Sequence, residues 1–149
     1  MRQLNLPCAD LKIKADVSGR AVVYDCWRRK WVALTPEEWV RQHFAWMLVQ
    51  DKGYMPGRMG NEVSIRLNDT DRRCDTVIYD NEMQPYMIVE YKAPDVVLTQ
   101  RVFDQIVRYN MVLHARYLTV SNGLVHYCCE IDYKNRTYRF LRDIPVYNP

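Results

Sequence analysis

Apolar and polar residues alternate along much of the chain with the two-residue period of β-strands. Three such stretches follow one another, and the polar residues at 68–73 and 81–85 between them are typical of hairpin loops. We therefore predict an antiparallel meander. Its strands are expected at residues 62–67, 74–80 and 86–92. Three closing strands are expected at residues 117–121, 124–131 and 137–141.

Two other stretches carry apolar residues at the three- to four-residue spacing of a helix. The first starts clearly, with Thr35 as N-cap and Pro36 at the first helical position, and is expected to end at residue 50 or 51. Its buried stripe consists of Val40, Phe44, Met47 and Leu48. The second helix is predicted from residue 98 or 99 to residue 113. Its core contacts are expected from Phe103, Ile106, Val107 and Met111.

Two glutamates, Glu37 and Glu38, occupy the first turn of the first helix. Glu37 precedes Val40 by three residues and therefore edges the buried stripe, whereas Glu38 falls nearer the opposite side with Gln42. The spacing favours Glu37 as the acid that faces inward. The alternative is that both acids serve only the helix start, where they stabilise the positive end of the helix dipole.

The residues before the first helix predict a small hairpin. Its strands are expected at 22–25 and 30–34, and a short strand at 11–14 precedes it. The basic stretch Trp27-Arg28-Arg29 would form the hairpin tip. Two alternatives remain open for this tip, because it could contact phosphates or be a solvated turn.

Length and composition agree with one globular domain. The chain has 149 residues, of which 48% are hydrophobic and 26% are charged. We expect an α+β fold with a central mixed sheet flanked by helices. The domain would comprise an N-terminal hairpin extension at 1–34, a core at 35–131, and a C-terminal strand and tail at 132–149.

Charge, cysteines and hydropathy narrow the cellular setting. A net charge of +3 permits nucleic acid as a partner without requiring it. The five cysteines form no C-x-x-C pair, which favours free thiols in a reducing compartment over disulfides or a zinc site. Residues 1–10 lack an apolar signal core, and no apolar run approaches the roughly 18 residues of a membrane span. We therefore expect a cytoplasmic protein with no membrane contact.

The stretch from Ile88 to Lys92 carries the main candidate chemistry. In a strand, Glu90 and Lys92 point to the same side, so an acid and an amine share one surface. An exposed ion pair is one explanation, although such pairs contribute only about 0–1 kcal/mol. Asp75 lies near the start of the preceding strand. The alternative explanation is that Asp75, Glu90 and Lys92 meet around a metal ion.

Residues on the predicted helices extend this candidate site. Gln105 and Tyr109 are four residues apart, so they share one face of the second helix. Arg41 follows Glu37 by four residues in the first helix. The glycine-rich stretch at 53–60 lacks the Gly-Lys-Ser/Thr ending of a phosphate-binding loop and is predicted to be a connection. Candidate phosphate contacts, or solvated surface residues, are Arg72, Arg73 and Arg101.

The order of these elements resembles the PD-(D/E)xK nuclease superfamily. That order is a helix with Glu, a strand, a strand with Asp75, a strand with Glu90-Tyr91-Lys92, a helix with Gln105-x-x-x-Tyr109, and a further strand. More narrowly, the chain is similar to the N-terminal nuclease domain of type I restriction enzyme R (motor) subunits. The stretches that carry this similarity are Tyr24-Asp25, residues 34–42, residues 74–77 and residues 89–94. Arg73-Cys74 stand where that family usually has Pro before the acid. These 149 residues have neither the length nor the phosphate-binding loop of the family's motor domains, so the sequence is either a stand-alone relative or a fragment.

The resemblance implies a restriction-endonuclease-like core of αβββαβ order and Mg²⁺-dependent hydrolysis of phosphodiester bonds in DNA, with Mn²⁺ as a substitute. It implies metal ligation by Asp75 and Glu90 and catalytic roles for Lys92 and Glu37. It implies that Gln105, Tyr109 and Arg41 position the nucleic acid. Implied partners are DNA and the motor or specificity subunits of a restriction system. The alternative is a nuclease-fold module that binds nucleic acid or acts as a scaffold without cleaving.

Overall fold

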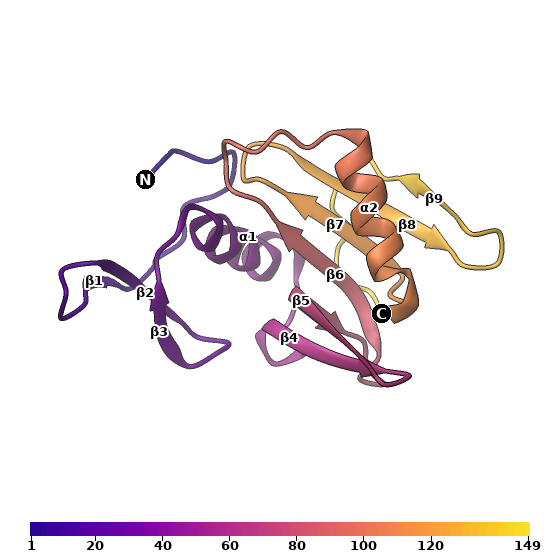
Figure 1. The fold of residues 1–149 in the computed structure, drawn as a ribbon, viewed down its shortest axis with the longest axis horizontal. Helices are drawn as coiled ribbons and strands as arrows, with labels where there is room; N and C mark the ends of the chain where they lie inside the picture. The colour runs from indigo at the N-terminus through magenta and orange to yellow at the C-terminus, as the bar shows by residue number, and fades with distance from the viewer.

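A six-stranded mixed sheet forms the centre of the computed structural model, which describes residues 1–149 (Figure 1). Its strands are adjacent in chain order, and all neighbours are antiparallel except β6 and β7. The parallel pair requires a crossover, which α2 supplies. The strands are β4 (Met59–Leu67), β5 (Thr70–Tyr79), β6 (Pro85–Tyr91), β7 (Tyr117–Ser121), β8 (His126–Asp132) and β9 (Thr137–Phe140). The predicted mixed sheet is thus confirmed.

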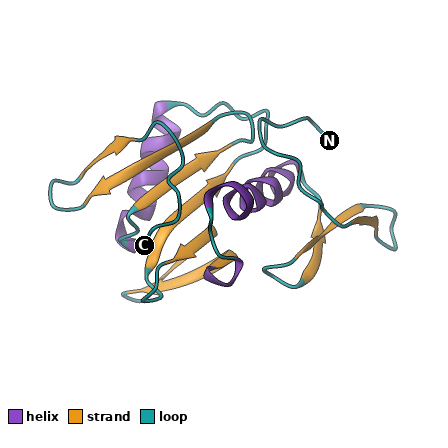
Figure 2. Cartoon of the chain, turned by 180° about the vertical axis from the view of Figure 1, so that it is seen from behind, coloured by secondary structure: helices purple, strands orange, loops and turns teal.

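Two helices lie against opposite faces of this sheet, as Figures 1 and 2 show from the two sides. On one face, α1 (Pro36–Lys52) packs in a core with Met87, Val89 and Tyr91 of β6. On the other face, α2 (Gln100–Asn110) packs in a second core that contains Ile88. Because side chains alternate along β6, Glu90 points to the α2 face together with Ile88.

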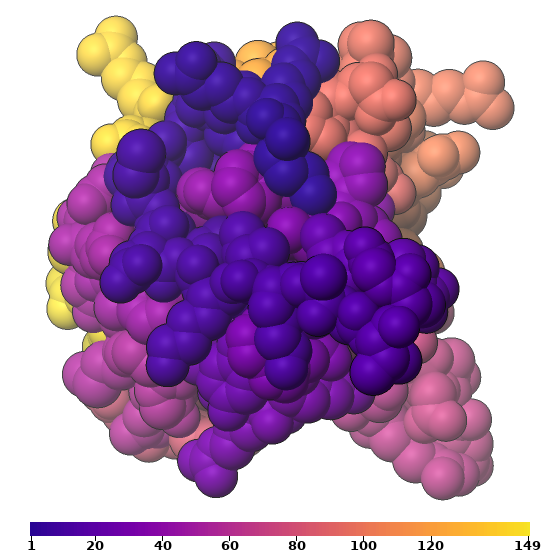
Figure 3. Space-filling model, turned by 90° about the vertical axis from the view of Figure 1, so that its left-hand side faces the viewer, coloured from indigo at the N-terminus to yellow at the C-terminus, as the bar shows by residue number.

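A second, three-stranded antiparallel sheet precedes α1. It contains β1 (Ile13–Ala15), β2 (Ala21–Asp25) and β3 (Lys30–Ala33). The predicted hairpin is thus confirmed, and the short strand predicted at 11–14 is present at Ile13–Ala15 and pairs with β2. N-terminal residues cover the side of the molecule shown in Figure 3. At the junction with α1, the rings of Trp27 and Trp46 lie 5.2 Å apart. This contact fixes the small sheet against a side of α1 that the large sheet does not cover.

Three predicted boundaries differ clearly from the structure. The first strand of the meander begins at Met59, within the stretch predicted to be a connection, and not at residue 62. The predicted loop at 68–73 is mostly strand, because β5 begins at Thr70 and only Asn68 and Asp69 form the turn. Both have positive φ angles, of 46° and 61°, which is the conformation of a two-residue turn that matches the twist of the strands. The second helix ends at Asn110, earlier than predicted, and a 3₁₀ turn follows at Met111–Leu113. Another 3₁₀ turn spans Pro56–Arg58.

The start of α1 depends on the predicted cap. Thr35 Oγ1 accepts a hydrogen bond of 3.0 Å from the backbone N–H of Glu38. We expect Thr35→Ala to lower the free energy of unfolding by about 1 kcal/mol, because this N–H loses its partner. Urea denaturation would measure the loss. Ser64→Ala, which removes an exposed hydroxyl with no such bond, is the control, and an equal effect of both variants would contradict the capping role.

Neither helix is long and apolar enough to cross a membrane.

Candidate metal and catalytic site

Asp75 and Glu90 lie opposite each other where β5 and β6 diverge. The last paired residues of these strands are Thr76 and Val89, so Asp75 and Glu90 are the next pair in register. Beyond that point the Asp75 side chain replaces the missing strand partner, since its Oδ2 accepts a hydrogen bond of 2.8 Å from the backbone N–H of Tyr91. The fork in the sheet thus brings together the two carboxylates predicted as metal ligands.

The electrostatics of Glu90 reflect this arrangement. Burial raises the pKa of Glu90 well above its usual range, and the neighbouring Asp75 carboxylate raises it further. Asn110 of α2 opposes this shift with a weak hydrogen bond of 3.5 Å from Nδ2 to Glu90 Oε1. Glu90 therefore favours a proton, or a cation shared with Asp75, over an isolated negative charge.

Lys92 and the two α2 residues predicted for the site line one pocket with Glu90. The pocket has a volume of ≈ 240 Å³. Its lining consists of Arg73, Glu90, Lys92, Gln105, Ile106, Tyr109 and Asn110. Lys92 follows the last residue of β6, and its backbone N–H donates a hydrogen bond of 2.9 Å to the Ser121 carbonyl. This bond continues the β6–β7 pairing by one residue and keeps Lys92 beside Glu90.

The other candidate arginines lie at different distances from this pocket. Arg73 lines it, and the guanidinium of Arg72 lies over the Tyr109 ring, 4.3 Å from its centroid. Arg101 is exposed in the first turn of α2 and does not line the pocket. Two of the three candidates therefore belong to the surroundings of the site.

Arg41 lies beneath the acids and is only 3% exposed. Its Nη2 lies 3.2 Å from Asp75 Oδ1 and 2.6 Å from Glu62 Oε1, and its Nη1 lies 2.5 Å from Glu38 Oε2. Both Nη atoms are engaged by protein carboxylates and the whole group is buried, so no exposed donor is left for a phosphate. The predicted role of Arg41 in positioning nucleic acid therefore does not fit, and its place is that of a buried counter-ion.

The two acids of the first helical turn differ in burial from the expectation, because Glu38 is buried and Glu37 is partly exposed. Glu38 lies off the apolar stripe beside Gln42, as predicted, but this side of the helix is buried: Glu38 is 5% exposed and is bonded to Arg28, Arg41 and Gln42. Glu37 has a 44% exposed side chain, yet it faces the site as expected. Burial and then the Asp75 carboxylate raise the pKa of Glu37, which indicates that these two acids are neighbours.

Glu62 was not among the predicted site residues. The β4–β5 register of Asn61 with Thr76 extends to Glu62 opposite Asp75, so acids of three strands form one row. The row consists of Glu62, Asp75 and Glu90. Glu62 Oε2 also accepts a hydrogen bond of 2.6 Å from Arg73 Nε. No group of three or more His, Cys, Asp or Glu residues is arranged to hold a metal ion, so Asp75 and Glu90 remain the candidate ligand pair.

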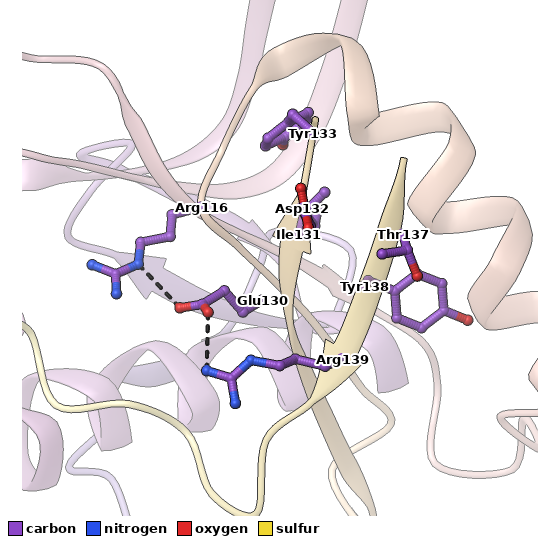
Figure 4. Close-up of a pocket in the computed structure, with 8 residues that line it drawn as sticks. All are labelled: Arg116, Glu130, Ile131, Asp132, Tyr133, Thr137, Tyr138 and Arg139. Atoms are coloured by element: carbon purple, nitrogen blue, oxygen red, sulfur yellow. Dashed lines mark hydrogen bonds and ion pairs between the residues drawn. The ribbon is translucent and has the colours of Figure 1, made fainter. Parts of the chain in front are cut away.

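A larger pocket of ≈ 470 Å³ lies at the other end of the sheet (Figure 4). Its lining consists of Arg116, Glu130, Ile131, Asp132, Tyr133, Thr137, Tyr138 and Arg139. Glu130 accepts hydrogen bonds from both arginines, of 3.2 Å from Arg116 and 3.0 Å from Arg139. Because these charges are already engaged and none of the predicted site residues is present, the smaller pocket beside Glu90 is the better candidate site.

Comparison with protein families gives a match over most of the chain. Residues 36–145 match the model of the family described as type I restriction enzyme R protein N terminus (HSDR_N). A search of curated proteins finds no match. The matched residues include α1, α2 and all six strands of the large sheet, and they leave out the three-stranded sheet. Since this match covers more than half of the chain, the protein belongs to the family of type I restriction enzyme R protein N termini.

Proposed function

We propose that this chain is a nuclease domain of a type I restriction system that hydrolyses phosphodiester bonds of DNA with Mg²⁺, for which Mn²⁺ substitutes. The observation that carries the proposal is the meeting of Asp75 and Glu90 beside Lys92. Family membership supports the restriction role. The proposal includes a restriction-endonuclease-like core, which agrees with the chain order α1, β4, β5, β6, α2, β7.

The chemistry of Asp75 and Glu90 suits a hard divalent cation. Both offer only oxygen donors, and Mg²⁺ is commonly bound by one or two carboxylates while it keeps several waters. Burial and then the Asp75 carboxylate raise the pKa of Glu90, and a cation between the two acids would remove the repulsion between them. Once bound, such an ion neutralises charge on the phosphate and activates a water.

The remaining site residues have separate tasks in this proposal. The Lys92 ammonium donates hydrogen bonds to the attacking water or to a phosphate oxygen within the pocket. Gln105 and Tyr109 project from exposed positions on α2 and hold the DNA backbone. Glu37 lies near Asp75 and Lys92, where it contributes a further acid.

The partners follow from the same family. In a type I restriction system the domain would act on DNA together with motor and specificity subunits. The alternative function, a module that binds or scaffolds without cleaving, predicts no divalent-cation affinity at Asp75 and Glu90. Calorimetric titration with Mn²⁺ distinguishes the two, because only the nuclease requires the ion.

Cleavage of supercoiled and linear DNA in Mg²⁺, Mn²⁺ or EDTA tests the proposal. We expect the wild-type protein to cleave only with metal. Lys92→Met should reduce cleavage by about 100- to 1,000-fold, because one preorganised donor to the reacting groups is lost. Calorimetric Mn²⁺ affinity should stay within about threefold of wild type, since an ammonium is not a metal ligand.

The matched control is Lys134→Met, which removes an exposed lysine in the β8–β9 turn. It should leave cleavage unchanged. Equal cleavage by Lys92→Met and the control would remove Lys92 from the reaction. Cleavage by the wild-type protein in EDTA would contradict the metal requirement.

A further inference from the structure

A continuous chain of ion pairs connects the three-stranded sheet to the candidate site. At one end, Arg28 Nε lies 2.6 Å from Asp25 Oδ2. The Nη2 of the same guanidinium bonds to Glu38 Oε1 of α1. Glu38 then bonds to Arg41, and Arg41 bonds to Asp75. Basic and acidic groups alternate along this relay, which consists of Asp25, Arg28, Glu38, Arg41 and Asp75.

The Asp25 end of the relay is buried and held by several hydrogen bonds. Asp25 is 0% exposed, and its carboxylate accepts hydrogen bonds from the backbone N–H groups of Trp27 and Arg28. It also accepts a bond of 2.9 Å from Asn61 Nδ2. These bonds outweigh burial and lower the pKa of Asp25, so it stays ionised opposite Arg28.

A second branch leads from Asp25 to the same part of the sheet. Asn61 Oδ1 accepts a hydrogen bond of 2.6 Å from Thr76 Oγ1. Thr76 Oγ1 in turn accepts a bond of 3.0 Å from the Tyr91 hydroxyl. Thr76 and Tyr91 are the neighbours in sequence of Asp75 and Glu90. A chain of hydrogen bonds through Asn61 therefore links Asp25 to both strands that carry the candidate metal ligands.

The geometry of Arg28 explains why an arginine stands at the junction. Its planar fork reaches two carboxylates at once, Asp25 through Nε and Glu38 through Nη2. A lysine has one compact ammonium and cannot reproduce this two-sided contact. Buried charges have a large desolvation cost, so they persist only in arrangements that pair all of them. The relay thus favours one position of Glu38 and, through it, one position of Arg41.

We propose that Asp25 and Arg28 are positioning residues for the metal-binding acids and act through Glu38 and Arg41. This inference rests on the proposed function for the role of Asp75. Both residues precede the span matched by the family model, which begins at residue 36. In this proposal the three-stranded sheet contributes to the site, because it sets the position of the Arg41 guanidinium, which pairs with Asp75 and Glu62.

Arg28→Lys in the full chain tests the proposal, with Mn²⁺ affinity measured by calorimetry. We expect affinity to fall by roughly 10- to 100-fold, the range for loss of a group that orients a metal ligand. The control is Arg20→Lys, the same exchange at an 82% exposed side chain that pairs with Asp16 in the same sheet region. The control should bind Mn²⁺ as the wild type does.

A metal-free readout separates this proposal from the proposed function. The side-chain ¹⁵N signals of Arg41 should show hindered rotation in the wild type, because three carboxylates hold its guanidinium. Arg28→Lys should release that rotation. Unchanged Arg41 signals together with unchanged Mn²⁺ affinity would overturn the relay. A wild type that binds no Mn²⁺ would overturn the proposed function, and the Arg41 signals would still decide the relay.

A second variant keeps the proposal testable if Arg28→Lys does not fold. Glu38→Gln keeps the shape of the side chain and its contact with Gln42, but it removes the charge that joins Arg28 to Arg41. The same loss of Mn²⁺ affinity and the same release of Arg41 rotation are expected. Wild-type values for both quantities would contradict the proposal.

Discussion

Asp75→Asn is expected to lower DNA cleavage by about 1,000-fold. In the proposed mechanism the ion held by this carboxylate would supply several kcal/mol of transition-state stabilisation, and each 1.4 kcal/mol corresponds to about tenfold in rate. The amide retains an oxygen that can accept the backbone N–H of Tyr91, so the fork between β5 and β6 is preserved. Single-turnover cleavage of a labelled duplex in Mg²⁺ would measure the effect.

The same exchange at Asp71 is the control. Asp71 is exposed on the same strand, β5, and lies away from the row of acids. Asp71→Asn should cleave at the wild-type rate. In Mn²⁺ calorimetry, Asp75→Asn should bind the ion weakly, whereas Asp71→Asn should bind it as the wild type does. Cleavage by Asp75→Asn within about threefold of wild type would remove the acid pair from the mechanism.

Arg41→Met is expected to lower the free energy of unfolding by about 3–5 kcal/mol. The methionine fills much of the space, but Glu38, Glu62 and Asp75 lose the cation that they share. Of these three acids, Glu38 is expected to destabilise the fold most when it loses the Arg41 counter-ion, because it is almost fully buried. Equilibrium urea denaturation, with the transition midpoint and slope fitted together, would measure the loss.

Arg139→Met is the matched control. Its guanidinium pairs with Glu130 on the surface and its side chain is 72% exposed, so the loss should be under about 1 kcal/mol. Adding Glu38→Gln to Arg41→Met should recover part of the stability, because it removes one acid from a buried cluster that retains only Arg28 as a counter-ion for Glu38 and Asp25. A loss from Arg41→Met no larger than that of the control would contradict the buried-counter-ion assignment.

Local patterns were sufficient for the elements and for the central acids. Alternation along residues 86–92 predicts that Glu90 and Lys92 share a side, and both line the pocket beside α2. The meander order predicts that Asp75 lies on the strand next to Glu90. These inferences succeed because strand period and hairpin adjacency are properties of short segments.

Glu62 was missed because register depends on turn length. The prediction assigned residues 68–73 to a loop, which leaves the pairing of β4 with β5 undefined. The actual turn contains only Asn68 and Asp69, and this length alone sets Glu62 opposite Asp75. An Asn-Asp pair between alternating stretches was the available signal.

The position of Glu38 could not be obtained from the helix pattern. The apolar stripe of α1 shows which side meets the large sheet, and Glu38 lies off that stripe. Its burial arises from Arg28 of the three-stranded sheet, which is a contact between segments that pack only in the folded protein. A polar side of a helix is ordinarily solvated, so no local rule identifies such a contact.

The single parallel pairing in the large sheet affects the stage of folding at which the candidate site is complete. Parallel strands join through a crossover, and such non-local pairings form slowly compared with hairpins. Asp75 and Glu90 belong to one hairpin, whereas Lys92 is held by Ser121 beyond the crossover helix. During folding the acids therefore meet early and the amine joins them late. In the proposed mechanism, a chain that has formed the β5–β6 hairpin but not the β6–β7 pairing would have both candidate metal ligands without a positioned Lys92.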